Sequence, residues 1–345
     1  MGDQLRLNIP DFEPRAPWWS GDLQTVRNTF IGANADLSPW PEKRREFVSG
    51  GGDDDRLAGR YQDPAEMGAD HACASTRQWT AQQTASRPLV ILVHGLTGSA
   101  DSLYLTHTAK ELLTHGFRVM RLSLRGSPPV AEYCTKQYHA GLTADLVAVV
   151  DQLPSGWVKS GVIFIGFSLG GNMVMRLAGE GLLGDRLHGV ASVSAPLDLK
   201  GCQRRIMRPR NWLYHRHILK LMVEGAAANA LPHQLRQRLP GLKTVYEFDD
   251  QIVAALHGFE GADDYYARNS AEGVVRDIAC PTLIIHSWDD PWIDPGVYKR
   301  LRGDLPGHHH LVMSDGGGHL GFHVRGLETT WHDHILTQFC LGTLA

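Results

Sequence analysis

Gly161-Val-Ile-Phe-Ile-Gly-Phe-Ser-Leu-Gly-Gly171 is the stretch of this 345-residue chain that decides its fold. The run Val162–Ile165 is apolar and largely β-branched, which predicts a buried strand, and Leu169–Ala178 predicts a helix. Between them lies Gly166-x-Ser168-x-Gly170. A strand, a sharp turn and a helix in this order are typical of a nucleophile elbow, which exposes a serine hydroxyl at the tip of a sheet. In a chain with 37 glycines, the alternative is a glycine-rich turn that holds an ordinary serine.

The alternation of strand and helix extends along most of the chain. Further short apolar runs predict strands at Leu89–Val93, Phe117–Leu122, Gly189–Val193, Thr282–His286 and His310–Met313. Helical patterns lie between them, at Leu103–His115, His139–Leu153, Val297–Leu301 and Trp331–Phe339. Strands that alternate with helices indicate an α/β fold with a mostly parallel central sheet, flanked by helices.

The alternation lapses between residues 196 and 278, where Ile206–Val223 and Leu231–Leu239 look helical. An insertion after the strand at 189–193 would lie above the strand tips, so we expect residues 196–278 to form a helical cap or lid. The core then comprises residues 41–195 and 279–345, and it begins with a hairpin of Lys43–Val48 and Arg56–Tyr61. Residues 1–40 are rich in proline and tryptophan, which suggests an extended N-terminal arm packed on the core.

Composition restricts the kinds of partner and the cellular compartment that we expect for this protein. With 34 Lys and Arg against 37 Asp and Glu, the net charge of −3 offers no general attraction for nucleic acid. The five cysteines are odd in number and form no CxxC pair, so neither a disulfide framework nor a zinc site is expected. The first ten residues lack the pattern of a secretory signal, and no apolar run reaches the length of a membrane span. We therefore expect a cytoplasmic protein without a transmembrane segment; its oligomeric state stays open.

Residues suited to serine catalysis follow the predicted strands. A nucleophilic serine needs a base, a group that orients the base, and fixed donors for the developing oxyanion. Asp289 and Asp290 follow the strand at 282–286, and His319 follows the strand at 310–313, in the chain order Ser, acid, His that this architecture uses. The backbone N–H groups of Leu96 and Leu169 are the predicted oxyanion donors, and Leu169 begins a helix. Position along the chain does not decide which of the two aspartates orients the base.

A set of longer motifs, spanning residues 22 to 322, is similar to those of the α/β-hydrolases and specifically of their YheT-like branch of predicted esterases. The matching pieces are Asp22-Leu-Gln-Thr25, His94-Gly-Leu-Thr-Gly-Ser99, Arg125-Gly126, Tyr138-His139, Gly166-Phe-Ser-Leu-Gly-Gly-Asn172, Glu247-Phe-Asp-Asp250, Leu256-His-Gly-Phe259, Asp264-Tyr-Tyr266, Asp289-Asp-Pro291 and Gly317-Gly-His319. Asp22 and Ser127-Pro-Pro129 depart from the family's usual residues, and both lie outside the catalytic positions.

The resemblance implies an α/β-hydrolase fold and hydrolysis of carboxylic esters without a cofactor. It implies that Ser168 is the nucleophile, His319 the base and Asp290 the group that orients it, because the family pattern has the acid at the second aspartate. We expect short- to medium-chain acyl esters as substrates. Acyl transfer and a lipid-directed lipase or phospholipase are the alternatives, and a non-catalytic binding protein of the same fold is a third.

Other patterns are interpreted as structural. The run His308–His310 alternates across a predicted strand, so at most two of its side chains share a face, and no metal site is expected. The acidic run Asp53–Asp55 is interpreted as a solvated turn rather than a calcium site. Gly316–Gly321 matches Gly-x-Gly-x-x-Gly, but too little chain follows it for a dinucleotide fold. The basic cluster Arg204, Arg205, Arg208, Arg210, Arg216 and Lys220 predicts a solvated helix face, with contact to an anionic head group or membrane surface as the alternative.

Overall fold

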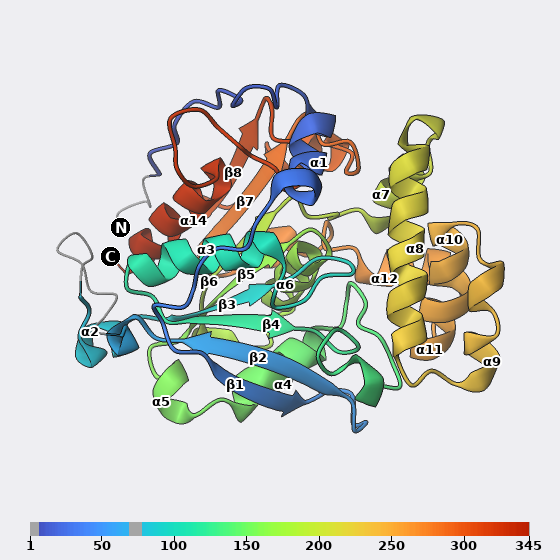
Figure 1. Ribbon diagram of the computed structural model, residues 1–345, viewed down its shortest axis with the longest axis horizontal. Coiled ribbons are helices and arrows are strands. Elements are labelled where there is room, and N and C mark those ends of the chain that lie inside the picture. The colour runs from blue at the N-terminus through green and yellow to red at the C-terminus, as the bar shows by residue number, and fades with distance from the viewer. Residues whose placement is uncertain (1–6, 69–77, 345) are drawn as a thin grey trace.

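The computed structural model describes residues 7–68 and 78–344 (Figure 1). In these residues the strands form one eight-stranded sheet of order β1-β2-β4-β3-β5-β6-β7-β8. The strands are β1 (Lys43–Val48), β2 (Arg56–Gln62), β3 (Leu89–Val93), β4 (Val119–Ser123), β5 (Val162–Phe167), β6 (Leu187–Val193), β7 (Thr282–Ser287) and β8 (His309–Ser314). The hairpin β1–β2 is antiparallel and pairs antiparallel with β4, and all other neighbours are parallel. The predicted mostly parallel α/β sheet is confirmed.

Helices cover both faces of this sheet. The helices of the core are α2 (Ala81–Ala85), α3 (Leu103–Thr114), α4 (Thr143–Gln152), α5 (Ser155–Val158), α6 (Leu169–Gly179), α13 (Gly296–Leu301) and α14 (Trp331–Gly342). Leu89, Ile91 and Val93 of β3 pack with α4, α6 and α13, whereas Val90 and Leu92 pack with α3 and α14. Successive strand residues face opposite sides, so a strand buried on both sides must be apolar throughout.

The strand order explains where the site lies. β3 has β4 on one side and β5 on the other, so the chain reverses its direction of winding between β3 and β5. In open α/β sheets, ligands bind beyond the carboxyl ends of the strands at such a switch point. All six residues of β5 are buried, which fixes the end of that strand firmly at this position.

An inserted helical region lies between β6 and β7, on the right in Figure 1. It comprises α7 (Leu199–Ile206), α8 (Trp212–Ala228), α9 (His233–Arg236), α10 (Val245–Phe248), a π-helix (Asp249–Ala254), α11 (Ala255–His257) and α12 (Ala262–Asn269). The single helix predicted over Ile206–Val223 is wrong, because the chain breaks around Pro209, whose ring cannot continue a helix. Only His233–Arg236 of the second predicted helix is α-helical.

The N-terminal segment is less extended than its composition suggests. Residues Gly21–Ile31 form the helix α1, capped by the Ser20 side chain, which accepts a hydrogen bond from the Leu23 N–H at 3.3 Å. Residues 1–6 of the predicted arm, and Cys73, lie outside the described residues. Trp40 is buried against the sheet, so this segment contributes to the core. No helix in the described part of the chain is long and apolar enough to cross a membrane.

The acidic run after β1 is a turn in which Asp54 is solvated, as its sequence predicts, but Asp53 is half-buried and Asp55 is not solvated. Asp55 is buried, and its carboxylate accepts the N–H groups of Thr135 (2.6 Å) and Lys136 (3.1 Å). Arg125, 1% exposed, donates to Asp53 at 2.8 Å and to Asp145. Asp53 and Asp55 therefore neutralise a buried arginine, which the local sequence could not indicate because Arg125 lies at least 70 residues away.

Candidate active site

Ser168 lies at a strained turn between β5 and α6. Its backbone has φ 50° and ψ −122°, a conformation that residues with a side chain rarely adopt. The flanking glycines are required by close backbone approach. A Cβ on Gly166 would lie 2.2 Å from the Gly170 carbonyl oxygen, and a Cβ on Gly170 would lie 2.4 Å from the His94 carbonyl oxygen. The geometry is that of a nucleophile elbow, in which local strain exposes the serine hydroxyl.

A chain of hydrogen bonds links Ser168 to His319 and Asp290. The Ser168 hydroxyl donates to His319 Nε2 at 3.0 Å, and His319 Nδ1–H donates to Asp290 Oδ2 at 2.9 Å. The structure thus brings together the three predicted residues from the ends of β5, β7 and β8. An ionised carboxylate can only accept, so Asp290 keeps the histidine proton on Nδ1 and leaves Nε2 free to take the serine proton.

Asp290 is held as an anion although it is fully buried. Burial alone would raise the pKa of its carboxyl, but the charge and hydrogen bond of His319, together with the Ile293 N–H, bring that pKa below its ordinary value. Asp290 Oδ1 accepts the N–H groups of Trp292 (2.7 Å) and Ile293 (3.0 Å). Both oxygens are therefore occupied, and the carboxylate has one orientation.

Asp289, the rival candidate, has a different set of partners. Its carboxylate accepts the Gly318 N–H at 2.8 Å and the hydroxyl of Ser287. It thereby connects the loop after β7 to the loop that carries His319, without contacting the imidazole in the described structure. The side chains of adjacent residues in a turn point in different directions. Asp290 can therefore contact the His319 ring while Asp289 contacts the backbone of the loop that carries it.

The loop after β3, which carries Leu96, is held from three sides. Tyr138 Oη accepts the Thr97 N–H (2.7 Å) and donates to the Gly95 carbonyl (3.0 Å), while Tyr104 Oη accepts the Gly95 N–H (2.9 Å). Buried His94 donates from Nδ1 to the Gly95 carbonyl and accepts the Leu124 N–H at Nε2. Burial lowers the pKa of His94 to about 4, so this histidine is a neutral brace for the loop. Among described residues, neither the Leu96 nor the Leu169 N–H donates to another protein group.

Comparison with known proteins gives the family. A family model described as alpha/beta hydrolase fold matches residues 88–325. The chain belongs to the α/β-hydrolase family. YheT of Escherichia coli (strain K12), a predicted esterase, is 31% identical over 246 residues, which cover 70% of this chain and 72% of the relative. This agrees with the family that the sequence motifs resemble.

More distant relatives extend the picture of this α/β-hydrolase. The mouse phospholipase ABHD3 is 25% identical over 263 residues, or 74% of this chain and 63% of the relative. A crystal structure of an esterase from Pyrococcus furiosus matches 100% of both chains with a TM-score of 0.54 and 16% identity, which supports the fold alone. These similarities place the chain among the esterase- and lipase-like serine hydrolases of this fold.

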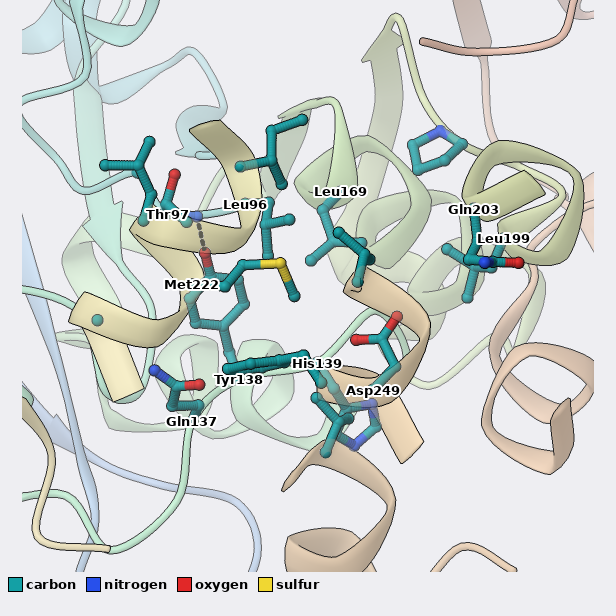
Figure 2. Close-up of a pocket in the computed structure, with 18 of the residues that line it drawn as sticks. Leu96, Thr97, Gln137, Tyr138, His139, Leu169, Leu199, Gln203, Met222 and Asp249 are labelled. Atoms are coloured by element: carbon teal, nitrogen blue, oxygen red, sulfur yellow. Dashed lines mark hydrogen bonds between the residues drawn. The ribbon is translucent and has the colours of Figure 1, made fainter. Parts of the chain in front are cut away.

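A cavity of about 300 Å³ lies between the elbow of this hydrolase and its inserted helices (Figure 2). Leu96 and Leu169, which carry the two predicted oxyanion donors, form part of its wall. The inserted region contributes apolar side chains: Leu199, Ile206, Ile218, Leu221, Met222, Val245, Phe248 and Val253. An ester held with its carbonyl at the elbow could therefore place an apolar chain in this cavity.

One buried carboxyl interrupts the apolar wall. Asp249, the first residue of the π-helix, is 8% exposed, and Figure 2 shows its carboxyl directed into the cavity. Tyr266 Oη donates to Asp249 Oδ2 at 2.6 Å. Burial raises the pKa of Asp249 to about 7 despite this hydrogen bond. No Lys or Arg is among the described residues that line the cavity, so this carboxyl has no cationic partner there.

Several residues support the site through hydrogen bonds that the sequence alone did not predict. The Thr25 hydroxyl accepts the His319 N–H at 2.8 Å, and the Gln24 side-chain amide both donates to the His323 carbonyl and accepts its N–H. Arg205 donates to the Asp290 carbonyl at 2.8 Å, so one member of the basic cluster faces inward and holds the loop after β7. The motif Asp22-Leu-Gln-Thr25 was the available signal for the first two; the sequence contains no comparable signal for Arg205.

Two histidines of the run at the start of β8 contact a backbone carbonyl. His308 and His309 each place Nε2 within hydrogen-bond distance of the Ile278 carbonyl, at 3.0 and 2.9 Å. In residues 7–68 and 78–344, no three His, Cys, Asp or Glu side chains are grouped so as to hold a metal ion.

Proposed function

We propose that this α/β-hydrolase is a serine carboxylic-ester hydrolase in which Ser168, His319 and Asp290 carry the reaction. The observation that supports the proposal most is the unbroken hydrogen-bonded chain from the Ser168 hydroxyl through the His319 ring to the buried Asp290 carboxylate. A serine hydroxyl becomes a competent nucleophile only when such a base is aligned with it and held in the right tautomer.

The reaction passes through an acyl-enzyme. Ser168 Oγ attacks the ester carbonyl carbon while His319 Nε2 takes the hydroxyl proton. The tetrahedral oxyanion accepts the N–H groups of Leu96 and Leu169. Collapse of this intermediate breaks the bond to the alcohol oxygen, which receives the proton from His319. Water then attacks the acyl-enzyme with His319 again as base. Collapse of this second intermediate breaks the bond to Ser168 Oγ, which takes the proton back from His319 as the carboxylic acid leaves.

We further propose that the inserted region, residues 196–278, acts as a cap that selects the acyl group. Its apolar side chains form much of the cavity wall, and a cavity of about 300 Å³ suits a short- to medium-chain acyl group. A lipid ester is the second candidate substrate, since a relative is named a phospholipase. Acyl transfer would use the same acyl-enzyme with an alcohol in place of water, and the ratio of ester to acid formed in an added alcohol distinguishes the two reactions.

The test is substitution of Ser168 together with labelling by a fluorophosphonate probe. We expect Ser168→Ala to lower kcat by about 10⁶-fold and to abolish labelling, with an unchanged melting temperature. Ser194→Ala is the matched control, because Ser194 directly follows the neighbouring strand β6 and its hydroxyl has no hydrogen-bond partner among described residues. Hydrolysis by Ser168→Ala within tenfold of wild type would refute the assignment. A wild-type protein that neither hydrolyses esters nor reacts with the probe would instead be a binding protein of this fold.

A further inference from the structure

One end of the inserted region, residues 204–216, is strongly basic; we call it the cap tip. The stretch 199–223 contains no Asp or Glu, in a chain whose net charge is −3, and its basic residues are Lys200, Arg204, Arg205, Arg208, Arg210, Arg216 and Lys220. Lys200, Arg210 and Lys220 pair with carboxylates, and Arg205 binds backbone carbonyls. Among the described residues, the exposed side chains of Arg204, Arg208 and Arg216 have no ion-pair partner.

The cap tip also exposes large apolar side chains to water. Leu213 is 73% exposed, Trp212 53% and Met207 37%. The Arg216 guanidinium lies over the Trp212 ring, 4.7 Å from its centroid, so charge and apolar surface are in direct contact. Figure 1 shows this end of α8 projecting beyond the neighbouring helices. Clustered exposed apolar side chains of this size mark an interaction surface.

The start of α1 extends this surface. The Asp22 carboxylate accepts hydrogen bonds from Arg210 (2.7 Å) and from Tyr214 Oη (3.0 Å), which ties α1 to the cap tip. Leu23, which follows Asp22, is 39% exposed, and Trp19, just before the start of α1, is 67% exposed. Exposed aromatic and aliphatic side chains therefore come from two elements that are joined by these contacts.

We propose that the cap tip and the start of α1 dock on an anionic lipid membrane. Anionic head groups complement Arg204, Arg208 and Arg216, while Trp212 and Leu213 enter the interfacial layer, where tryptophan and aliphatic side chains are favoured beside cations. Nucleic acid would complement the arginines but leave Leu213 in water. An anionic membrane interacts favourably with both the arginines and the exposed apolar side chains.

Docking in this way would also bring the lipid close to residues that line the cavity. Ile206 at the end of α7 and Ile218 on α8 belong to the same two helices as the cap tip and line the cavity. This proposal does not depend on ester hydrolysis, because membrane binding can be measured whether or not the protein catalyses a reaction.

The test is co-sedimentation of the full chain with vesicles of phosphatidylcholine alone or with added phosphatidylglycerol. We expect binding to the anionic vesicles that weakens as salt is raised. Each cation near such a surface contributes about fivefold to binding, so Arg204→Gln, Arg208→Gln and Arg216→Gln together should weaken it about a hundredfold. Trp212→Ala with Leu213→Ala should weaken sedimentation as well, although it keeps every charge.

Matched controls lie on the opposite side of the molecule from the active site, near the amino-terminal ends of β5, β6 and β8. Leu182→Ala removes a side chain that is 50% exposed, and Lys159→Gln with Arg302→Gln removes exposed charges; all should bind like wild type. Hydrolysis of a water-soluble acetate ester should be the same in every variant, which separates failure of docking from failure of folding or of the active site. Equal binding of wild type to both vesicle types, no binding to either, or retention by an oligonucleotide but not by vesicles would overturn the proposal.

Discussion

Replacing Asp290 with asparagine tests how the hydrogen-bonded chain works. The N–H groups of Trp292 and Ile293, at 2.7 and 3.0 Å, hold one carboxylate oxygen and would hold the amide oxygen in the same place. The amide NH₂ would then face His319 Nδ1, where the wild type has an accepting oxygen at 2.9 Å. An NH₂ group donates, so Nδ1 would have to accept, and the imidazole proton would move to Nε2.

That proton would point at Ser168 Oγ, 3.0 Å away, and Nε2 could no longer take the serine proton. A wrong tautomer of this kind costs about 10⁴ in kcat, which corresponds to about 5.4 kcal/mol in the activation free energy. We expect a loss of this size for Asp290→Asn, with KM nearly unchanged because the cavity wall is intact.

Steady-state kinetics on a short-chain ester is the assay, with ¹⁵N NMR of the His319 ring as a direct reading of the tautomer. Asp289→Asn is the matched control, since its amide oxygen can still accept the Gly318 N–H, and its loss should stay below about tenfold. The reasoning fails if Asp290→Asn keeps more than a tenth of the activity, or if Asp289→Asn costs more than Asp290→Asn.

Three further results are expected. Thr25→Ala should lower kcat up to about tenfold by freeing the His319 backbone, and Thr25→Ser should restore it; equal kinetics of both variants would contradict this. Met222→Gln in the cavity wall should flatten the rise of kcat/KM with acyl length, which is about 0.8 kcal/mol per methylene, while acetate hydrolysis is kept; equal loss on all esters would give the cap a purely structural role. Because burial raises the pKa of Asp249 from 3.8 to about 7, the folded state keeps a proton that the unfolded state has released between those pH values. As the pH rises through this range, the free energy of unfolding should fall by up to about 1.4 kcal/mol per pH unit. Urea unfolding at a series of pH values measures this, and in Asp249→Asn the free energy of unfolding should depend less steeply on pH.

Much of the architecture could be predicted because it is local. The apolar run of β5, the two glycines around Ser168 and the start of α6 are contiguous, and each choice of residue agrees with the backbone that it must adopt. The same holds for β3, whose five residues are all apolar and buried, so that burial on both faces leaves a continuous apolar signal in the sequence.

The tertiary structure alone decided which groups contact which. Position along the chain could not separate Asp289 from Asp290, because adjacent residues of one turn differ only in the direction of their side chains. Thr25 supports His319 across almost three hundred residues, and Arg205 faces inward although it belongs to a basic cluster. Periodicity and composition describe a residue's own segment, whereas these contacts depend on how distant segments meet.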